Sequence, residues 1–229
     1  MGGWGEYAAA WAVFLLSHML PARPRLRRPL IAALGERGYV AAYSLVSVLV
    51  LAWLIVAAGR APFVPLWGWA AWQAWVPNLA MPLACVLLAL GLGIPNPFSI
   101  GGAQNDRFDP ARPGVLALTR HPVLLAIVLW AASHVPPNGD LATATLFGAF
   151  AAMGLLGMRA LDARRRRSWG EPRWRAMARG TGRLRIALPA VATPGLALRV
   201  AAGLCGWLLL LVLHPIVIGV APLPALNRL

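Results

Sequence analysis

The chain has 229 residues, of which 59% are hydrophobic and 12% are charged, and its mean hydropathy is +0.67. A soluble domain carries about a quarter of its residues as charges, so this composition leaves too little polar surface for a water-soluble globule and excludes that class. All 21 basic residues are arginines, and the net charge is +14. Because these arginines fall between apolar runs, as membrane topology requires, no nucleic-acid partner is expected.

Six apolar segments follow one another along the chain, separated by breaks that carry proline, glycine or charge. They cover residues 7–20, 39–58, 74–93, 115–134, 141–161 and 196–220. Most reach the ~20 residues that a helix needs to cross a ~30 Å hydrocarbon layer. The first has no basic region before it and no small-residue cleavage site after it, so it is expected to be a retained span. We predict an all-α integral membrane bundle of about six transmembrane helices, forming a single domain over residues 1–229.

The arginines set the expected orientation in the membrane. Of the 21, 19 fall in the breaks after the first, third and fifth segments or at the segment ends that border them, and the other two are Arg60 and Arg228. The positive-inside rule places these three breaks in the cytoplasm. We therefore predict a multi-pass protein of the bacterial inner (plasma) membrane with both termini in the periplasm and the lipid bilayer as its main partner.

Residues 159–195 form the one stretch of soluble character, an amphipathic, arginine-rich cytoplasmic segment within the membrane domain. Its first part is predicted to continue the fifth helix into water. Trp169, Trp174 and Met177 then recur among arginines, as in a helix that lies among lipid headgroups. Two interpretations stay open: an anchor on anionic lipid, or a lid over a site that opens to the cytoplasm.

Histidines are the candidate chemical groups of this chain. His18, His121 and His134 lie in or beside predicted spans, and His214 lies in the sixth. Polar side chains at membrane depth usually face the bundle interior or a functional site. Several imidazoles together favour metal or haem ligation, although interhelical hydrogen bonding is the simpler alternative for any one of them. None of the seven acidic residues lies in mid-span, which argues against a paired-carboxylate site in the bilayer.

Three strings stand out in or beside the first, second and fourth segments. They are Phe14-Leu15-Leu16-Ser17-His18, Leu34-Gly35-Glu36-Arg37-Gly38-Tyr39 and Leu118-Thr119-Arg120-His121-Pro122. Together with His134, they resemble the NnrU family. That family includes bacterial proteins associated with denitrification and the membrane 15-cis-zeta-carotene isomerases of plants and cyanobacteria. The resemblance covers nearly the whole chain.

The resemblance implies a haem b-binding membrane protein that acts as an isomerase or redox protein in denitrification or zeta-carotene isomerisation. Its substrate would be a hydrophobic small molecule, and the enzyme activity implied is haem-dependent cis–trans isomerisation. His18, His121 and His134 match histidines of the isomerases, with His18 and His134 implied as iron ligands. The chain departs from the isomerases at Ala131, where they carry a cysteine, and lacks a further histidine after the second span.

Depth in the membrane favours a different pair of iron ligands. The predicted topology puts His18 and His121 near the cytoplasmic face, and the thirteen residues from His121 to His134 span ~20 Å of helix. Since two axial ligands of one iron lie about 4 Å apart, His18 pairs better with His121, and all three stay candidate haem-iron ligands. Arg37 and Arg120, at the same face, would bind haem propionates or serve only as positive-inside anchors.

A second resemblance leads to a different function. Arg120-His121-Pro122 before a span, followed by Trp169-Gly170 and an arginine-rich run, is similar to the isoprenylcysteine carboxyl methyltransferase group, which binds S-adenosylmethionine. A tyrosine and a glycine of that group are replaced here by Leu124 and Ala126, and Leu161-Asp162 stands near the position of a glutamate pair. A methyltransferase-like enzyme is therefore one alternative. A non-enzymatic accessory protein of nitrogen-oxide respiration, with protein partners that the sequence does not identify, is the other.

Overall fold

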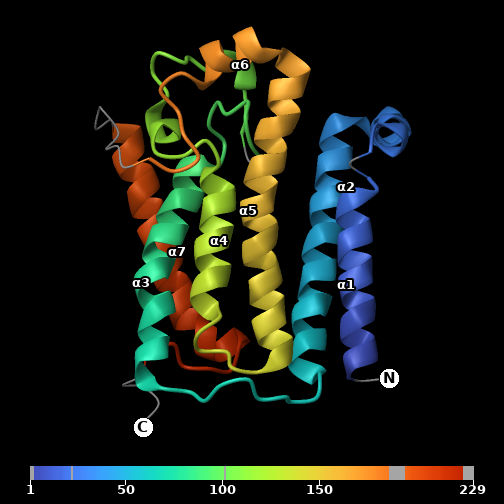
Figure 1. The fold of residues 1–229 in the computed structure, drawn as a ribbon, viewed down its shortest axis with the longest axis vertical. Helices are drawn as coiled ribbons and strands as arrows, with labels where there is room; N and C mark the ends of the chain where they lie inside the picture. The colour runs from blue at the N-terminus through green and yellow to red at the C-terminus, as the bar shows by residue number, and fades with distance from the viewer. Residues whose placement is uncertain (1–2, 22, 101, 186–193, 224–229) are drawn as a thin grey trace. The chain divides into compact units, whose positions relative to one another are not determined.

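We describe the protein from a computed structural model (Figure 1), in which residues 3–21, 23–100, 102–185 and 194–223 are described. Residues 186–193 of the predicted cytoplasmic segment and residue Arg228 lie outside this part. The helices of the described residues are α1 (Trp4–Met19), α2 (Pro24–Arg60), α3 (Ala71–Gly91), η1 (Asn105–Arg107), η2 (Gly114–Ala117), α4 (Pro122–His134), α5 (Leu141–Trp169), α6 (Glu171–Ala178) and α7 (Pro194–Val217). The described part contains no strand, only an isolated bridge between Pro65 and Asp140.

Four helices in the described part are long and apolar enough to cross a membrane, namely α2, α3, α5 and α7. Their outer faces carry apolar side chains; Leu45, Val48 and Leu49 of α2, for example, are all more than half exposed. Such a surface is stable against lipid and not against water. The chain is thus an all-helical membrane protein. Helices α1 and α4, with 16 and 13 residues, are shorter, so the number of six spans stays a prediction.

The chain divides into two compact units, which we describe separately. Unit 1 comprises Met1–Gly68 and Gly139–Leu146, and unit 2 comprises Trp69–Asn138 and Phe147–Leu229. In unit 1, α1 packs along α2. The buried Tyr7 hydroxyl donates a hydrogen bond to the carbonyl of Ala142 at 2.9 Å, which ties α1 to the start of α5 within this unit.

Helix α2 is longer than the apolar segment that predicted it. It begins at Pro24, where the fixed φ of proline suits the first helical turn. The arginine-rich break expected between the first two segments is therefore helical, and the prediction of a loop there is wrong. The helix is interrupted at Gly35, whose φ of 70° and ψ of 166° favour glycine, and it resumes into the apolar run.

In unit 2, α3 packs against both α4 and α7, as Figure 1 shows. Glycines allow close approach between these helices. The backbone of Val86 on α3 lies directly against Gly203 of α7, and Val128 of α4 lies against Gly154 of α5. Small residues at helix contacts are the usual means by which membrane helices pack.

The fourth apolar segment forms a shorter helix than predicted. Residues 115–117 belong to η2, and α4 begins only at Pro122. The physical reason is the proline, which disfavours helical geometry in the residue before it; His121 has φ −124° and ψ 55°. At about 20 Å, α4 is shorter than a hydrocarbon layer, and Leu116 of η2 is buried in the protein.

The fifth helix continues past its apolar part, as predicted, and ends at Trp169. After Gly170 the short helix α6 begins. Its Glu171 accepts hydrogen bonds from Arg166 and from Arg175, and these two guanidinium groups lower the pKa of Glu171 to about 2. The Glu171 carboxylate thus lies between two arginines at the junction of α5 and α6.

Candidate functional site

A buried carboxylate organises the end of unit 2 that carries α6. Asp162 of α5 is 4% exposed and accepts four hydrogen bonds. Its Oδ1 lies 3.0 Å from Nε2 of His121 and 3.3 Å from Nε of Arg120, and its Oδ2 lies 2.9 Å from Nη2 of Arg120 and 2.8 Å from Nε of Arg183. We call these four residues the Asp162 cluster. A buried charge costs several kcal/mol unless it is paired and hydrogen-bonded, and both oxygens of Asp162 are fully engaged.

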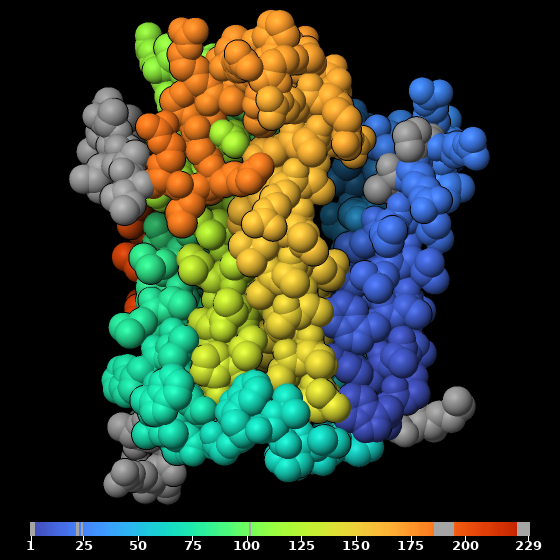
Figure 2. Space-filling model, in the orientation of Figure 1, coloured from blue at the N-terminus to red at the C-terminus, as the bar shows by residue number. Residues whose placement is uncertain are grey.

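Backbone hydrogen bonds hold the residues after α6 against the residues before α4. The amide of Arg120 donates to the carbonyl of Gly182 at 2.7 Å, and that of Arg185 donates to Leu118 at 2.8 Å. The Arg120 guanidinium also lies 5.2 Å from the ring centre of Trp174, a cation–π contact. In Figure 2 the orange segment containing α6 lies over the green loop at this end of unit 2. The tryptophans predicted for a lipid-facing helix thus also pack inward.

The Asp162 cluster joins segments that are far apart in the sequence. His121 is fully buried and donates from Nε2 to the carboxylate, while its Nδ1 has no hydrogen-bond partner in the described residues. Asn96, also fully buried, donates to the carbonyl of Arg120 at 3.0 Å. Because the Asp162 carboxylate and the Arg120 guanidinium both bond to protein groups, the cluster holds together α5, the residues before α4 and the residues after α6.

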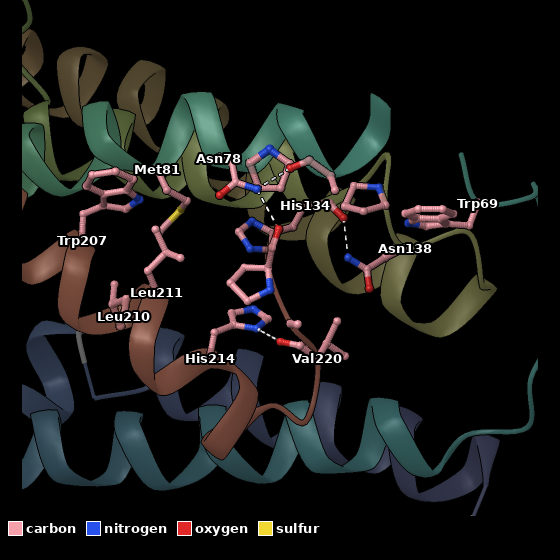
Figure 3. A pocket seen from close by; sticks show the side chains of 15 residues that line it. Trp69, Asn78, Met81, His134, Asn138, Trp207, Leu210, Leu211, His214 and Val220 are labelled. Atoms are coloured by element: carbon pink, nitrogen blue, oxygen red, sulfur yellow. Dashed lines mark hydrogen bonds between the residues drawn. The ribbon is translucent and has the colours of Figure 1, made fainter. Parts of the chain in front are cut away.

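A pocket of about 260 Å³ lies near the C-terminal ends of α4 and α7, within unit 2 (Figure 3). Its walls come from α3, α4, α7 and the residues that follow α4 and α7. The lining residues are Trp69, Ala74, Pro77, Asn78, Met81, His134, Pro137, Asn138, Trp207, Leu210, Leu211, His214, Val220, Ala221 and Pro222. The pocket is mostly apolar, and two imidazoles are its only titratable groups among the described residues.

Both imidazoles of this pocket are fixed through the same ring nitrogen. Nδ1 of His134 lies 2.7 Å from the carbonyl oxygen of Trp130, and Nδ1 of His214 lies 2.6 Å from that of Val220. A carbonyl oxygen only accepts, so Nδ1 carries the hydrogen in each ring. In the neutral ring the lone pair is then on Nε2, which is the arrangement that protein histidines use to bind metals.

His18 shows the same local geometry in unit 1. Its Nδ1 lies 2.8 Å from the carbonyl of Phe14, and its ring stacks on Phe14 at 4.1 Å between centroids. The pattern aromatic-x-x-Ser-His therefore occurs twice, ending at His18 and at His134. In both copies the residue four positions earlier supplies the carbonyl that orients the imidazole.

The structure separates residues that the haem prediction grouped together. Arg120 precedes α4 and His134 ends it, about 20 Å away along the helix. Arg37 is exposed on α2, in unit 1. Among the described residues no group of three or more His, Cys, Asp or Glu side chains gathers as a metal site.

The sequence patterns did not identify His214 as a ligand, and they did not identify Asp162 as the partner of Arg120 and His121. The signal for His214 was its place inside an apolar span, in Leu213-His214-Pro215. Asp162 follows His121 by 41 residues, and only the packing of α5 beside the start of α4 brings the two together.

Comparison with known proteins agrees with the resemblance seen in the sequence. The family model described as NnrU protein matches residues 6–222. No curated protein and no solved structure matches the chain. Since the family model covers nearly the entire sequence, the chain belongs to the NnrU family.

Proposed function

We propose that this membrane protein binds haem b, with Nε2 of His134 as an iron ligand. The observation that carries the proposal is the hydrogen bond from Nδ1 of His134 to the carbonyl of Trp130, which leaves Nε2 as the ligating nitrogen inside a pocket. When bound, the haem would supply a redox-active iron. The family resemblance also implies this residue as a ligand.

The chemistry of the pocket suits this group. Trp69, Trp207 and Pro77 offer flat apolar surfaces, which complement a macrocycle. Pockets for drug-sized ligands have volumes of about 300–1,000 Å³, so about 260 Å³ encloses part of a haem, and the pocket is partly open. The propionates would not meet Arg120, which is bonded to Asp162 at the other end of α4.

Neighbouring residues hold the imidazole of His134 in one orientation. Asn138 donates from its side chain to the carbonyl of His134 at 2.7 Å, which closes the turn after α4. Phe147 stacks on the His134 imidazole at 5.1 Å between centroids. With Nδ1 fixed as well, the ring has little freedom, so an iron ligand here is pre-organised.

Haem titration into the detergent-purified protein tests the proposal. We expect saturable binding with a Soret shift, and a loss of affinity of more than about 100-fold in His134→Ala, because the ligand itself is removed. Val135→Ala is the matched control, since it keeps the imidazole, lies next to His134 but outside the pocket lining, and should bind nearly as well as the parent. A parent protein that fails to bind haem would overturn the proposal.

A further inference from the structure

We propose that His214 and His134 together form a two-imidazole site for a transition-metal centre. Under the proposed function, on which this assignment of the occupant rests, the centre would be haem iron, held by His214 together with His134. The alternative source of the same chemistry is a free metal ion. His214 was not among the ligands expected from the sequence.

The two histidines reach the pocket from different helices. His134 ends α4 and His214 lies near the end of α7, and both line the same space, as Figure 3 shows. The carbonyl bonded to each Nδ1 assigns the lone pair to Nε2 in both neutral rings. Two rings with their lone pairs on Nε2 therefore line one pocket.

The chain after α7 is folded back over the pocket by polar contacts. Asn78 of α3 donates to the carbonyl of Pro222 at 2.8 Å, and His214 donates to the carbonyl of Val220 at 2.6 Å. In an apolar environment, backbone groups of a non-helical turn are costly unless they are satisfied in this way. The fold therefore maintains an irregular turn where it lines a cavity.

The lining also indicates which metals the site would take. It contains the two imidazoles and the thioether of Met81, and no carboxylate among the described residues. Imidazole and thioether donors suit iron, copper and zinc, whereas magnesium and calcium need oxygen ligands. The site thus selects a transition metal.

The test compares His214→Ala and His214→Gln with the parent, using electron paramagnetic resonance of the ferric haem complex. Two imidazole ligands give a low-spin iron, so removal of His214 should convert it to high spin or lower haem affinity at least about tenfold. Leu213→Ala, next to His214 but outside the pocket lining, should leave the spectrum unchanged. His18→Ala tests the other expected ligand.

A second arm titrates the haem-free protein with Co²⁺ and follows its visible absorption. If the parent binds no haem but binds Co²⁺ in a manner lost in both His134→Ala and His214→Ala, the proposed function fails and the two-imidazole site stands. If haem binds and the His214 variants keep the parent spectrum, the site is overturned and the proposed function stands. Absence of both haem binding and His214-dependent Co²⁺ binding overturns both.

Discussion

Among the described residues, Asp162 is the only carboxylate that is buried. Its charge is balanced by Arg120 at 2.9 Å and Arg183 at 2.8 Å, and its remaining acceptor capacity is used by His121. Loss of one partner in such a cluster leaves the other charges buried and uncompensated, which is costlier than the pair itself is stabilising. The carboxylate therefore has a stabilising role that does not depend on any ligand.

Asp162→Asn should reduce the free energy of unfolding by about 3 kcal/mol, because Arg120 would lose its buried counter-charge. Thermal unfolding in detergent, followed by circular dichroism, measures the effect, and a fall in the midpoint of at least several degrees is expected. Asp106→Asn, at an exposed position, is the control and should leave the midpoint unchanged. Equal midpoints for Asp162→Asn and the parent would contradict the stabilising role of the cluster.

The sequence indicated residue types better than partners. Arg120, His121 and His134 could be singled out because rare polar groups beside apolar runs need a reason to be there. Their partners could not be predicted from the sequence, because the bond between His121 and Asp162 joins positions that are 41 residues apart. The hydrogen bond that orients His134 is local, and its aromatic-x-x-Ser-His pattern was visible in the sequence.

Helices α3 and α7 supply opposite parts of the pocket, Asn78 from one and His214 from the other. Their approach depends on Gly203. A Cβ at this position would lie 2.6 Å from the Cα of Val86 and 2.9 Å from the carbonyl oxygen of Cys85. Since both neighbours are backbone atoms, the helices would have to move apart.

Gly203→Ala should therefore destabilise the protein by about 1–3 kcal/mol, the usual cost of overpacking, and weaken haem binding by spreading the pocket walls. Gly206→Ala is a matched control on the same helix, because nothing lies within 4 Å of its added Cβ. Thermal unfolding and haem titration of the two variants measure both effects. If the two variants behave alike, the close contact does not control the pocket.

Hydropathy located most of the helices but not all of their ends. The apolar runs predicted α3 and α7 to within a few residues, because lipid-facing helices need continuous apolar sequence. Hydropathy misplaced the start of α4. The apolar run begins at Val115, but the helix begins only at Pro122, because the residue before the proline, His121, is not helical. Hydropathy also missed the helical stretch before Gly35, whose arginines and alanines are good helix formers in a segment that hydropathy alone assigns to a loop.

Unit 2 of this membrane protein contains two polar sites of different kinds. At one end, both oxygens of Asp162 accept hydrogen bonds from side chains of the protein. At the other end, two oriented imidazoles line a pocket whose walls are otherwise mostly apolar. In the Asp162 cluster, the charges are balanced within the protein. In the pocket, the two Nε2 atoms are available to bind a ligand. The functional proposal rests on this contrast and on membership of the NnrU family.

The absorption spectrum of the protein purified in detergent from haem-replete cells tests the proposed haem binding most directly. A Soret band that copurifies with the parent protein and is lost in His134→Ala is the result that we predict. A colourless parent protein that takes up no haem, or a Soret band that persists undiminished in His134→Ala, would contradict the assignment. A colourless protein that binds S-adenosylmethionine would favour the methyltransferase-like alternative, and one that binds neither would favour the accessory role.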